Sequence, residues 1–171
     1  MQPIALPPMR ARASVVLAEE HESARLALCA LLSRFPKEAF TTGNVDTLDD
    51  VRGVMCHVTS VNFSYACWIA RVLGRLDPAV EKREKAEFLA RVRSFTSAEE
   101  HEEGSRVAAT RYYAALAEIA PEDFDRDFKT NWGPMISIEA MLEHAFAHLI
   151  RHRRQLEVFL GMRSAPVTRG D

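Results

Sequence analysis

Apolar residues recur every third or fourth position along four long stretches of this chain, and polar, glycine or proline residues separate the stretches. Because such spacing gathers apolar side chains on one face of a helix, the pattern predicts four amphipathic α-helices. The first helix is expected from Ser14 to Phe35, and Pro36 ends it because proline disfavours helical geometry in the preceding residue. Its apolar stripe consists of Leu17, Ala24, Leu28, Leu31 and Phe35.

The second helix is expected from Thr47 to Leu76, with the Thr47 hydroxyl as its N-terminal cap and Asp77-Pro78 as its stop. Its apolar stripe consists of Val54, Val61, Tyr65, Trp68 and Val72. A short, heavily charged helix is expected to follow over roughly residues 78–93 and to lie against the outside of the other helices.

The third long helix is expected to begin at Ser97, because Ser97 and Glu100 have the spacing of a capping box, and to end before Pro121. Its inner side is predicted to hold Val107, Thr110, Tyr113 (or Ala114) and Ala117. The next segment, residues 121–134, is expected to form a structured loop or a short hairpin that includes Phe124, Phe128 and Trp132.

The last helix is expected from about Ser137 to Phe159 or Leu160, with Gly161 as its C-terminal stop. Its apolar sector consists of Ile138, Met141, Ala145, Leu149, Leu156 and Phe159. Four such helices joined by short or moderate links predict an all-α protein, an antiparallel four-helix bundle with a short extra helix between helices two and three. We expect residues 1–163 to form this single domain and residues 164–171 to form a flexible C-terminal tail.

Composition and charge narrow the classes of partner. The formal net charge is -2 and no basic block is present, which argues against a nucleic-acid partner. No apolar run approaches the roughly 20 residues that a membrane-spanning helix needs. The N-terminal stretch lacks the long apolar core of a secretory signal, and Cys29, Cys56 and Cys67 lie in apolar helical patterns typical of buried, reduced thiols. These features together predict a cytoplasmic protein.

The six histidines carry the most specific chemical signal. His148 and His152 are four residues apart, so they stack on one helix face and could bind one ion, and His144 and His148 have the same spacing. At about 100° per residue, His152 projects into the apolar sector of the last helix and His148 lies at its edge, whereas His144 is rotated outward. His57 lies beside the apolar stripe of the second helix and is the natural third ligand from a facing helix.

Structural roles compete with metal binding at each of these positions. A single histidine on an apolar face is more often a hydrogen-bonded core residue than a ligand, but three inward histidines on two helices favour a metal site. His21 falls on the inner stripe of the first helix, where a solvent-edge or hydrogen-bonded role is favoured over lining the same cavity. His101 lies in an acidic first turn and is expected to be exposed.

Three motifs are specific to this chain: Val-Met-Cys-His57-Val followed by Tyr65 and Trp68, His148-x3-His152-Arg-Arg-Gln155, and Gly133-Pro134-Met135 before the last helix. In these motifs the chain resembles the DinB/YfiT-like family of four-helix metalloproteins. The chain departs from the family pattern at Arg154, where glycine is usual. The resemblance implies a His57, His148 and His152 site with open positions filled by water, binding nickel, zinc, iron or manganese. Since relatives often pair through their helices, the resemblance also implies a homodimer as one of two expected states, the other being a monomer.

Three imidazoles leave coordination positions open, which is the pattern of a reactive metal ion and indicates a metal-dependent transferase or hydrolase of small molecules. The resemblance implies a metal-dependent thiol S-transferase or isomerase that joins a low-molecular-weight thiol to a small-molecule substrate. The alternatives are a non-catalytic metal-binding or stress-response protein and a bundle that buries its histidines by hydrogen bonding alone. His144, Gln155 and Tyr65 are candidates for the surroundings of the metal. Tyr65, Trp68 and Arg151 could line a pocket near the metal, but each has a structural alternative, as a core aromatic residue or as a solvated helix charge. No catalytic residue is assigned.

Overall fold

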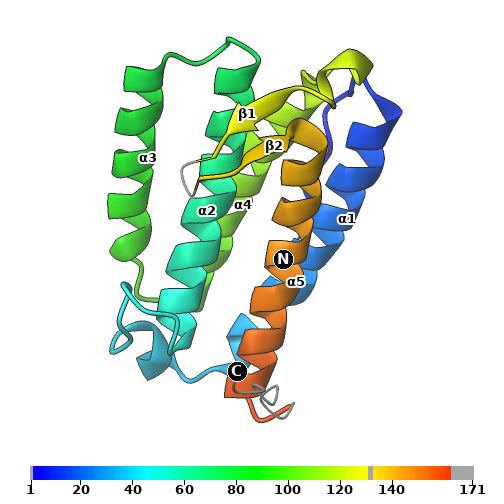
Figure 1. Cartoon of the computed structure of the whole chain (residues 1–171). Helices are drawn as coiled ribbons and strands as arrows, with labels where there is room; N and C mark the ends of the chain where they lie inside the picture. Colours follow the sequence, from blue (N-terminus) through cyan, green and yellow to red (C-terminus); the bar gives the residue numbers. More distant parts are fainter. Residues whose placement is uncertain (1, 131–132, 163–171) are drawn as a thin grey trace, which may run out of the picture.

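The computed structural model describes residues 2–130 and 133–162 (Figure 1). Trp132 and the predicted tail, residues 164–171, lie outside the described residues. The described chain is mostly helical, which confirms the all-α prediction. Its α-helices are α1 (Arg12–Cys29), α2 (Val51–Val72), α3 (Pro78–Arg93), α4 (Ala98–Ala117) and α5 (Ile138–Phe159). Short 3-10 helices occupy Leu32–Arg34, Lys37–Phe40 and Pro121–Asp123. One antiparallel pair of strands, β1 (Asp127–Lys129) and β2 (Met135–Ser137), forms a hairpin, which was one of two alternatives for residues 121–134, although its second strand lies just beyond that segment.

Four helices pack side by side, each against two others: α1 contacts α4 and α5, and α2 contacts the same two helices from the opposite side. The charged helix α3 packs on α2 outside this group, as predicted (Figure 1). The helices do not simply alternate in direction. Ala18 of α1 shares one apolar cluster with Ala145 of α5, and Leu28 shares another with Leu156, so α1 and α5 run the same way. Helices α2 and α4 also run the same way, because α3 returns the chain along α2 before α4 begins (Figure 1).

Three of the predicted helix ends in α1 and α2 are wrong. Helix α1 ends at Cys29 rather than Phe35, and the chain continues into a 3-10 helix before Pro36. Helix α2 is capped by Asp50 rather than Thr47, because the Asp50 carboxylate accepts a hydrogen bond from the Gly53 N–H (2.8 Å). It ends at Val72 because Gly74 adopts a positive φ of 72° and the Arg75 N–H donates to the Ala70 carbonyl (2.8 Å), a Schellman arrangement.

The remaining helix ends follow the sequence signals closely. Asp77 caps the start of α3, and Pro78 is its first residue, in agreement with the helix expected over residues 78–93. Ser97 caps α4 and Ser137 caps α5, each accepting a backbone N–H bond of 3.1 Å. The predicted stop at Gly161 is confirmed by its positive φ of 67°. Short polar side chains and glycines therefore fix most helix ends locally.

Two of the predicted apolar faces need correction. In α4 the predicted Val107 is half-buried and Thr110 is exposed, whereas the buried face contains Ala108, Ala109, Tyr112, Tyr113, Leu116 and Ala117. This face is rotated because α4 packs against α1 and α2 at once and the small Ala108 and Ala109 allow close approach. In α5 Phe159 is 37% exposed in the final turn, although the rest of its predicted apolar sector is buried.

The three cysteines are buried, as expected from the sequence analysis. Cys29, Cys56 and Cys67 are buried free thiols, and burial raises the pKa of each. Among the described residues no helix combines the length and the apolar character that crossing a bilayer requires.

The expectation that His101 is exposed is wrong. His101 is 0% exposed and lies between the rings of Phe40 and Phe95, with centroid distances of 5.8 and 5.4 Å. Both of its ring nitrogens are buried without a hydrogen-bond partner within the described parts of the chain. Burial, and next the nearby Arg52 charge, lower the pKa of His101 to about 4. The acidic turn indicated exposure, but two aromatic rings from segments outside the helix cover it.

We expect His101→Leu to stabilise the protein, because leucine fills a similar space without burying two unsatisfied nitrogens. The free energy of unfolding should rise by about 1 kcal/mol at pH 7, measured by urea denaturation. Since His101 has a lowered pKa in the fold, the unfolded chain binds more protons between pH 6.5 and about 4, and stability falls as the pH drops through that window. The variant should lose less stability over that window; an unchanged acid response would contradict this account of His101.

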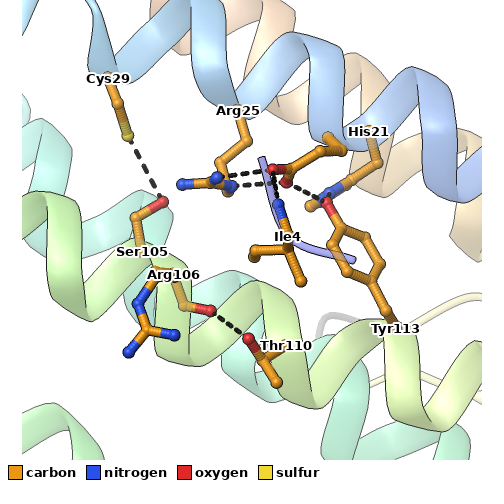
Figure 2. Close-up of polar contacts among 9 residues, drawn as sticks. Ile4, His21, Arg25, Cys29, Ser105, Arg106, Thr110 and Tyr113 are labelled. Carbon is orange, nitrogen blue, oxygen red and sulfur yellow. Dashed lines mark hydrogen bonds and ion pairs between the residues drawn. The ribbon is translucent and has the colours of Figure 1, made fainter. Parts of the chain in front are cut away.

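A buried charged network joins α1 and α4 (Figure 2). Arg25 is fully buried and donates two hydrogen bonds of 2.7 Å to the Glu22 carboxylate, which is 6% exposed. The same carboxylate accepts from the Tyr113 hydroxyl (2.8 Å) and from the Ile4 backbone N–H (2.9 Å), so it also anchors the N-terminal segment. Burial raises the pKa of Glu22, but the hydrogen bonds from Arg25, Ile4 and Tyr113 outweigh it and leave the pKa lowered. The charge of Arg25 is therefore compensated inside the protein.

Glu22→Gln should destabilise the protein strongly, because it leaves the buried Arg25 charge without a counterion. We expect a loss of about 3 kcal/mol or more in the free energy of unfolding, and partial recovery in Glu22→Gln/Arg25→Met, which removes both charges. Because the pKa of Glu22 is lowered in the fold, its contribution is present above pH 4.5 and is lost as the pH falls. Acid unfolding followed by circular dichroism should show a shallower pH dependence for the double variant; equal stability of all three proteins would refute this role.

Candidate metal centre

Helices α2 and α5 bring His57, His148 and His152 together. The His148 Nε2 atom lies 3.0 Å from His57 Nε2 and 3.2 Å from His152 Nε2. One nitrogen from each of the three histidines lies within 4.8 Å of the other two. The spacing of four residues along α5 places His148 and His152 on adjacent turns, and the contact between α2 and α5 supplies His57. The three histidines that the sequence singles out therefore form one cluster.

Burial keeps these imidazoles neutral. His148 is 7% exposed and His152 is 4% exposed, whereas His57 is half-buried. Burial, followed by repulsion from the neighbouring histidines, lowers the pKa of His148 to about 2 and that of His57 to about 4. Burial also lowers the pKa of His152, although its hydrogen bond with Gln155 acts in the opposite direction. At neutral pH all three rings carry a nitrogen lone pair that a metal ion can accept.

Gln155 fixes which nitrogen of His152 carries the proton. The Gln155 amide nitrogen donates to the Leu48 carbonyl (2.6 Å), which turns its oxygen toward His152. That oxygen lies 2.9 Å from His152 Nδ1, and because an amide oxygen only accepts, Nδ1 must donate. The lone pair of His152 is therefore on Nε2, facing His148. Such a partner behind a ligand imidazole orients the ring and makes it a better donor.

The chemistry of the cluster fits a cation better than a hydrogen-bonded set. If His148 Nε2 carries a proton, it can donate that proton to only one of its two neighbouring nitrogens, which leaves the other short contact without a hydrogen bond. Metal–nitrogen bonds of about 2.1 Å place ligand nitrogens roughly 3.0 Å apart in an octahedron and roughly 3.4 Å apart in a tetrahedron. The two Nε2 spacings from His148, 3.0 and 3.2 Å, fall within this range. His148 Nδ1 is buried and has no hydrogen-bond partner in the described chain, unlike Nδ1 of His152.

The other predicted neighbours occupy the border of the cluster. Tyr65 is 1% exposed and its ring lies edge-on to His148 and His144, at centroid distances of 6.1 and 6.0 Å. His144 is exposed and is not part of the cluster of converging nitrogens. The exposed Arg151 contributes positive charge that helps lower the pKa of His144, after burial. Trp68 packs edge-on against Tyr65 at 5.6 Å, the core role that was its structural alternative.

His21 does not join the cluster. It is 1% exposed, and its Nδ1 lies 2.9 Å from the Tyr113 hydroxyl, next to the Glu22–Arg25 network. Burial lowers the pKa of His21 to about 4. The hydrogen-bonded role is therefore the correct one of the two that the sequence favoured.

A cavity of about 400 Å³ reaches His57 from the side of α3. Its lining includes Val45, Asp46, Ser60, Leu89 and Arg93, together with Leu48. Sequence reasoning missed this lining because most of it comes from the loop before α2 and from α3, which carry no ligand-type pattern. The Leu48 carbonyl was missed for a further reason: it is a backbone group, and no side-chain motif indicates its bond to Gln155.

Comparison with known proteins supports the resemblance noted from the sequence. The family profile of the DinB family matches residues 9–166 of the chain. Searches of curated proteins and of solved structures gave no match.

We expect Gln155→Leu to weaken zinc binding by about 10- to 100-fold, because it removes the acceptor that orients His152. The measurement is a competition titration of the metal-free protein with zinc and a chromophoric chelator. Arg154→Leu is the matched control, because Arg154 is an exposed neighbour on the same helix. Equal zinc affinity in the wild type and Gln155→Leu would show that the Gln155 contact does not support a ligand.

Proposed function

The chain belongs to the DinB family, and we propose that it holds one divalent metal ion on the Nε2 atoms of His57, His148 and His152. The observation that carries this proposal is the convergence of three neutral imidazoles, at 3.0 and 3.2 Å from the central His148. The family match over residues 9–166 supports it independently. Of the nickel, zinc, iron and manganese that the resemblance implies, the all-imidazole ligand set favours the first three, because manganese prefers oxygen ligands.

We further propose that the site serves a thiol S-transferase or isomerase acting on small molecules. When bound, a cation on three imidazoles polarises whatever occupies its open positions and can stabilise a thiolate at neutral pH. Four residues of the chain have separate roles in this site. His148 and His152 form the buried side of the site, Gln155 holds the ring of His152, and the half-buried His57 forms the edge that the cavity reaches.

The alternative is a non-catalytic metal-binding or stress-response protein. A closed site with a full ligand set would favour that alternative, because structural metal sites leave no position for a substrate. Three ligands beside a cavity of about 400 Å³, a volume in the range of small-molecule sites, support the catalytic proposal instead.

The bundle arrangement and the domain bounds are also part of the proposal. We assign α1, α2, α4 and α5 to a four-helix bundle, with residues 1–163 as one domain. The cytoplasmic location and the homodimer remain predictions from the sequence analysis.

Untagged protein purified without chelators should contain about one equivalent of divalent metal, measured by mass spectrometry of the ions, and His148→Ala should lose it. His148 is the most informative position because it lies between the other two histidines. His144→Ala is the matched control: it removes an exposed histidine one turn away and should retain the metal. Absence of metal from the wild type, even after incubation with nickel, zinc, iron or manganese, would overturn the metal proposal.

The same preparations separate the two functional proposals. Metal-dependent consumption of a low-molecular-weight thiol with chlorodinitrobenzene as a general electrophile, lost in His148→Ala, would support the transferase. Stoichiometric metal without consumption of several thiols and electrophiles would support the non-catalytic alternative.

A further inference from the structure

The cavity beside His57 has a pair of opposite charges in its lining. Arg93, at the end of α3, donates a hydrogen bond from its guanidinium to the carboxylate of Asp46. The two side chains are 46% and 63% exposed, so their mutual attraction is screened by water and contributes little to stability. Such a pair can exchange partners with a ligand at small cost. The metal proposal by itself requires neither residue.

The position of this pair is fixed from both sides. Arg52 donates to the backbone carbonyl of Arg93 (3.2 Å) and to the carbonyl of Gly43 (3.1 Å), which ties the end of α3 to the loop that carries Asp46. The same loop contains Leu48, whose carbonyl accepts the hydrogen bond from Gln155, the partner of His152. The loop therefore connects the charged pair to the histidine cluster through backbone contacts.

The apolar part of the cavity lining suits a short apolar chain. Val45, Val61 and Leu89 line the cavity together with Ser60. His57, Asp46 and Arg93 line the same volume of about 400 Å³, so one small molecule in this cavity can contact all three. The lining of the cavity thus combines an imidazole and a pair of opposite charges with apolar side chains.

We propose that this cavity binds the α-amino-acid head group of a small thiol, with its carboxylate on Arg93 and its ammonium on Asp46. This inference rests on the proposed function, since the thiol end would lie toward the metal centre. A ligand with only a carboxylate would meet repulsion from Asp46, and a ligand with only an ammonium would meet repulsion from Arg93. A zwitterionic head group satisfies both residues at once, so the paired charges select it over either singly charged analogue.

The test uses the cobalt(II)-loaded protein and three thiols of matched length: homocysteine, 4-mercaptobutanoate, which lacks the ammonium, and 3-mercaptopropylamine, which lacks the carboxylate. Thiolate binding to cobalt is followed by its charge-transfer absorption in the near ultraviolet. Homocysteine should bind about tenfold more tightly than either analogue, since each analogue loses one charge-assisted hydrogen bond.

Two variants assign the charges to the residues. Arg93→Gln should abolish the preference for homocysteine over 3-mercaptopropylamine, and Asp46→Asn should abolish its preference over 4-mercaptobutanoate. The matched controls are Arg91→Gln and Asp49→Asn, which change exposed charges in the same helix and the same loop and lie outside the cavity lining. Both controls should retain the preferences of the wild type.

The outcomes distinguish this inference from the function on which it rests. Absence of a charge-transfer band with all three thiols would overturn the proposed thiol chemistry and the head-group assignment with it. Bands of equal affinity for the three thiols in the wild-type protein would overturn the head-group assignment alone. Preferences that persist unchanged in Arg93→Gln and Asp46→Asn would also overturn it.

Discussion

The removal of imidazole rings from water between α2 and α5 is the constraint on which the rest of the site depends. In water these rings would be partly protonated near pH 6.5, and three of them within contact distance would repel one another. Burial of His148 and His152 lowers their pKa values and keeps the nitrogens available as lone-pair donors. The cost of burying polar nitrogens is then offset only if something satisfies them. The proposed cation at the point of convergence would do this for all three at once.

The same desolvation rule explains the other buried polar groups of the protein. Glu22 and Arg25 are buried together, and each finds its partners inside the fold, so the pair is compensated. His101 is buried without a partner and gains no such compensation within the described chain. The histidine cluster is intermediate: Nδ1 of His152 is hydrogen-bonded to Gln155, whereas Nδ1 of His148 has no partner among the residues that the structure describes. The position of each polar group relative to its neighbours, rather than its burial alone, decides its contribution.

The loop before α2 links parts of the molecule that the helices keep apart. Asp50 caps α2 and so fixes the start of the helix that carries His57. Leu48 holds Gln155 of α5 through its carbonyl, and Asp46 meets Arg93 of α3. One short segment therefore positions the second helix, supports a histidine of the cluster and forms part of the cavity. A change in this loop would therefore alter the histidine cluster and the cavity, although the loop provides no candidate ligand.

The sequence by itself determined the elements and the identity of the cluster. Helical periodicity fixes the angle at which each side chain leaves its own helix. The inward direction of His148 and His152 and the outward rotation of His144 therefore follow from their spacing alone. Helix ends at Ser97, Ser137 and Gly161 are also local, because a cap involves residues only a few positions apart.

Only the tertiary structure decided the features that depend on which segments become neighbours. The shared direction of α1 and α5, the rotated face of α4 and the burial of His101 beneath Phe40 and Phe95 arise from packing between distant parts of the chain. The Leu48 carbonyl behind Gln155 and the Asp46–Arg93 pair near His57 have the same origin. Periodicity describes one helix at a time, whereas these contacts depend on how helices and loops with no common periodicity fill the space between them.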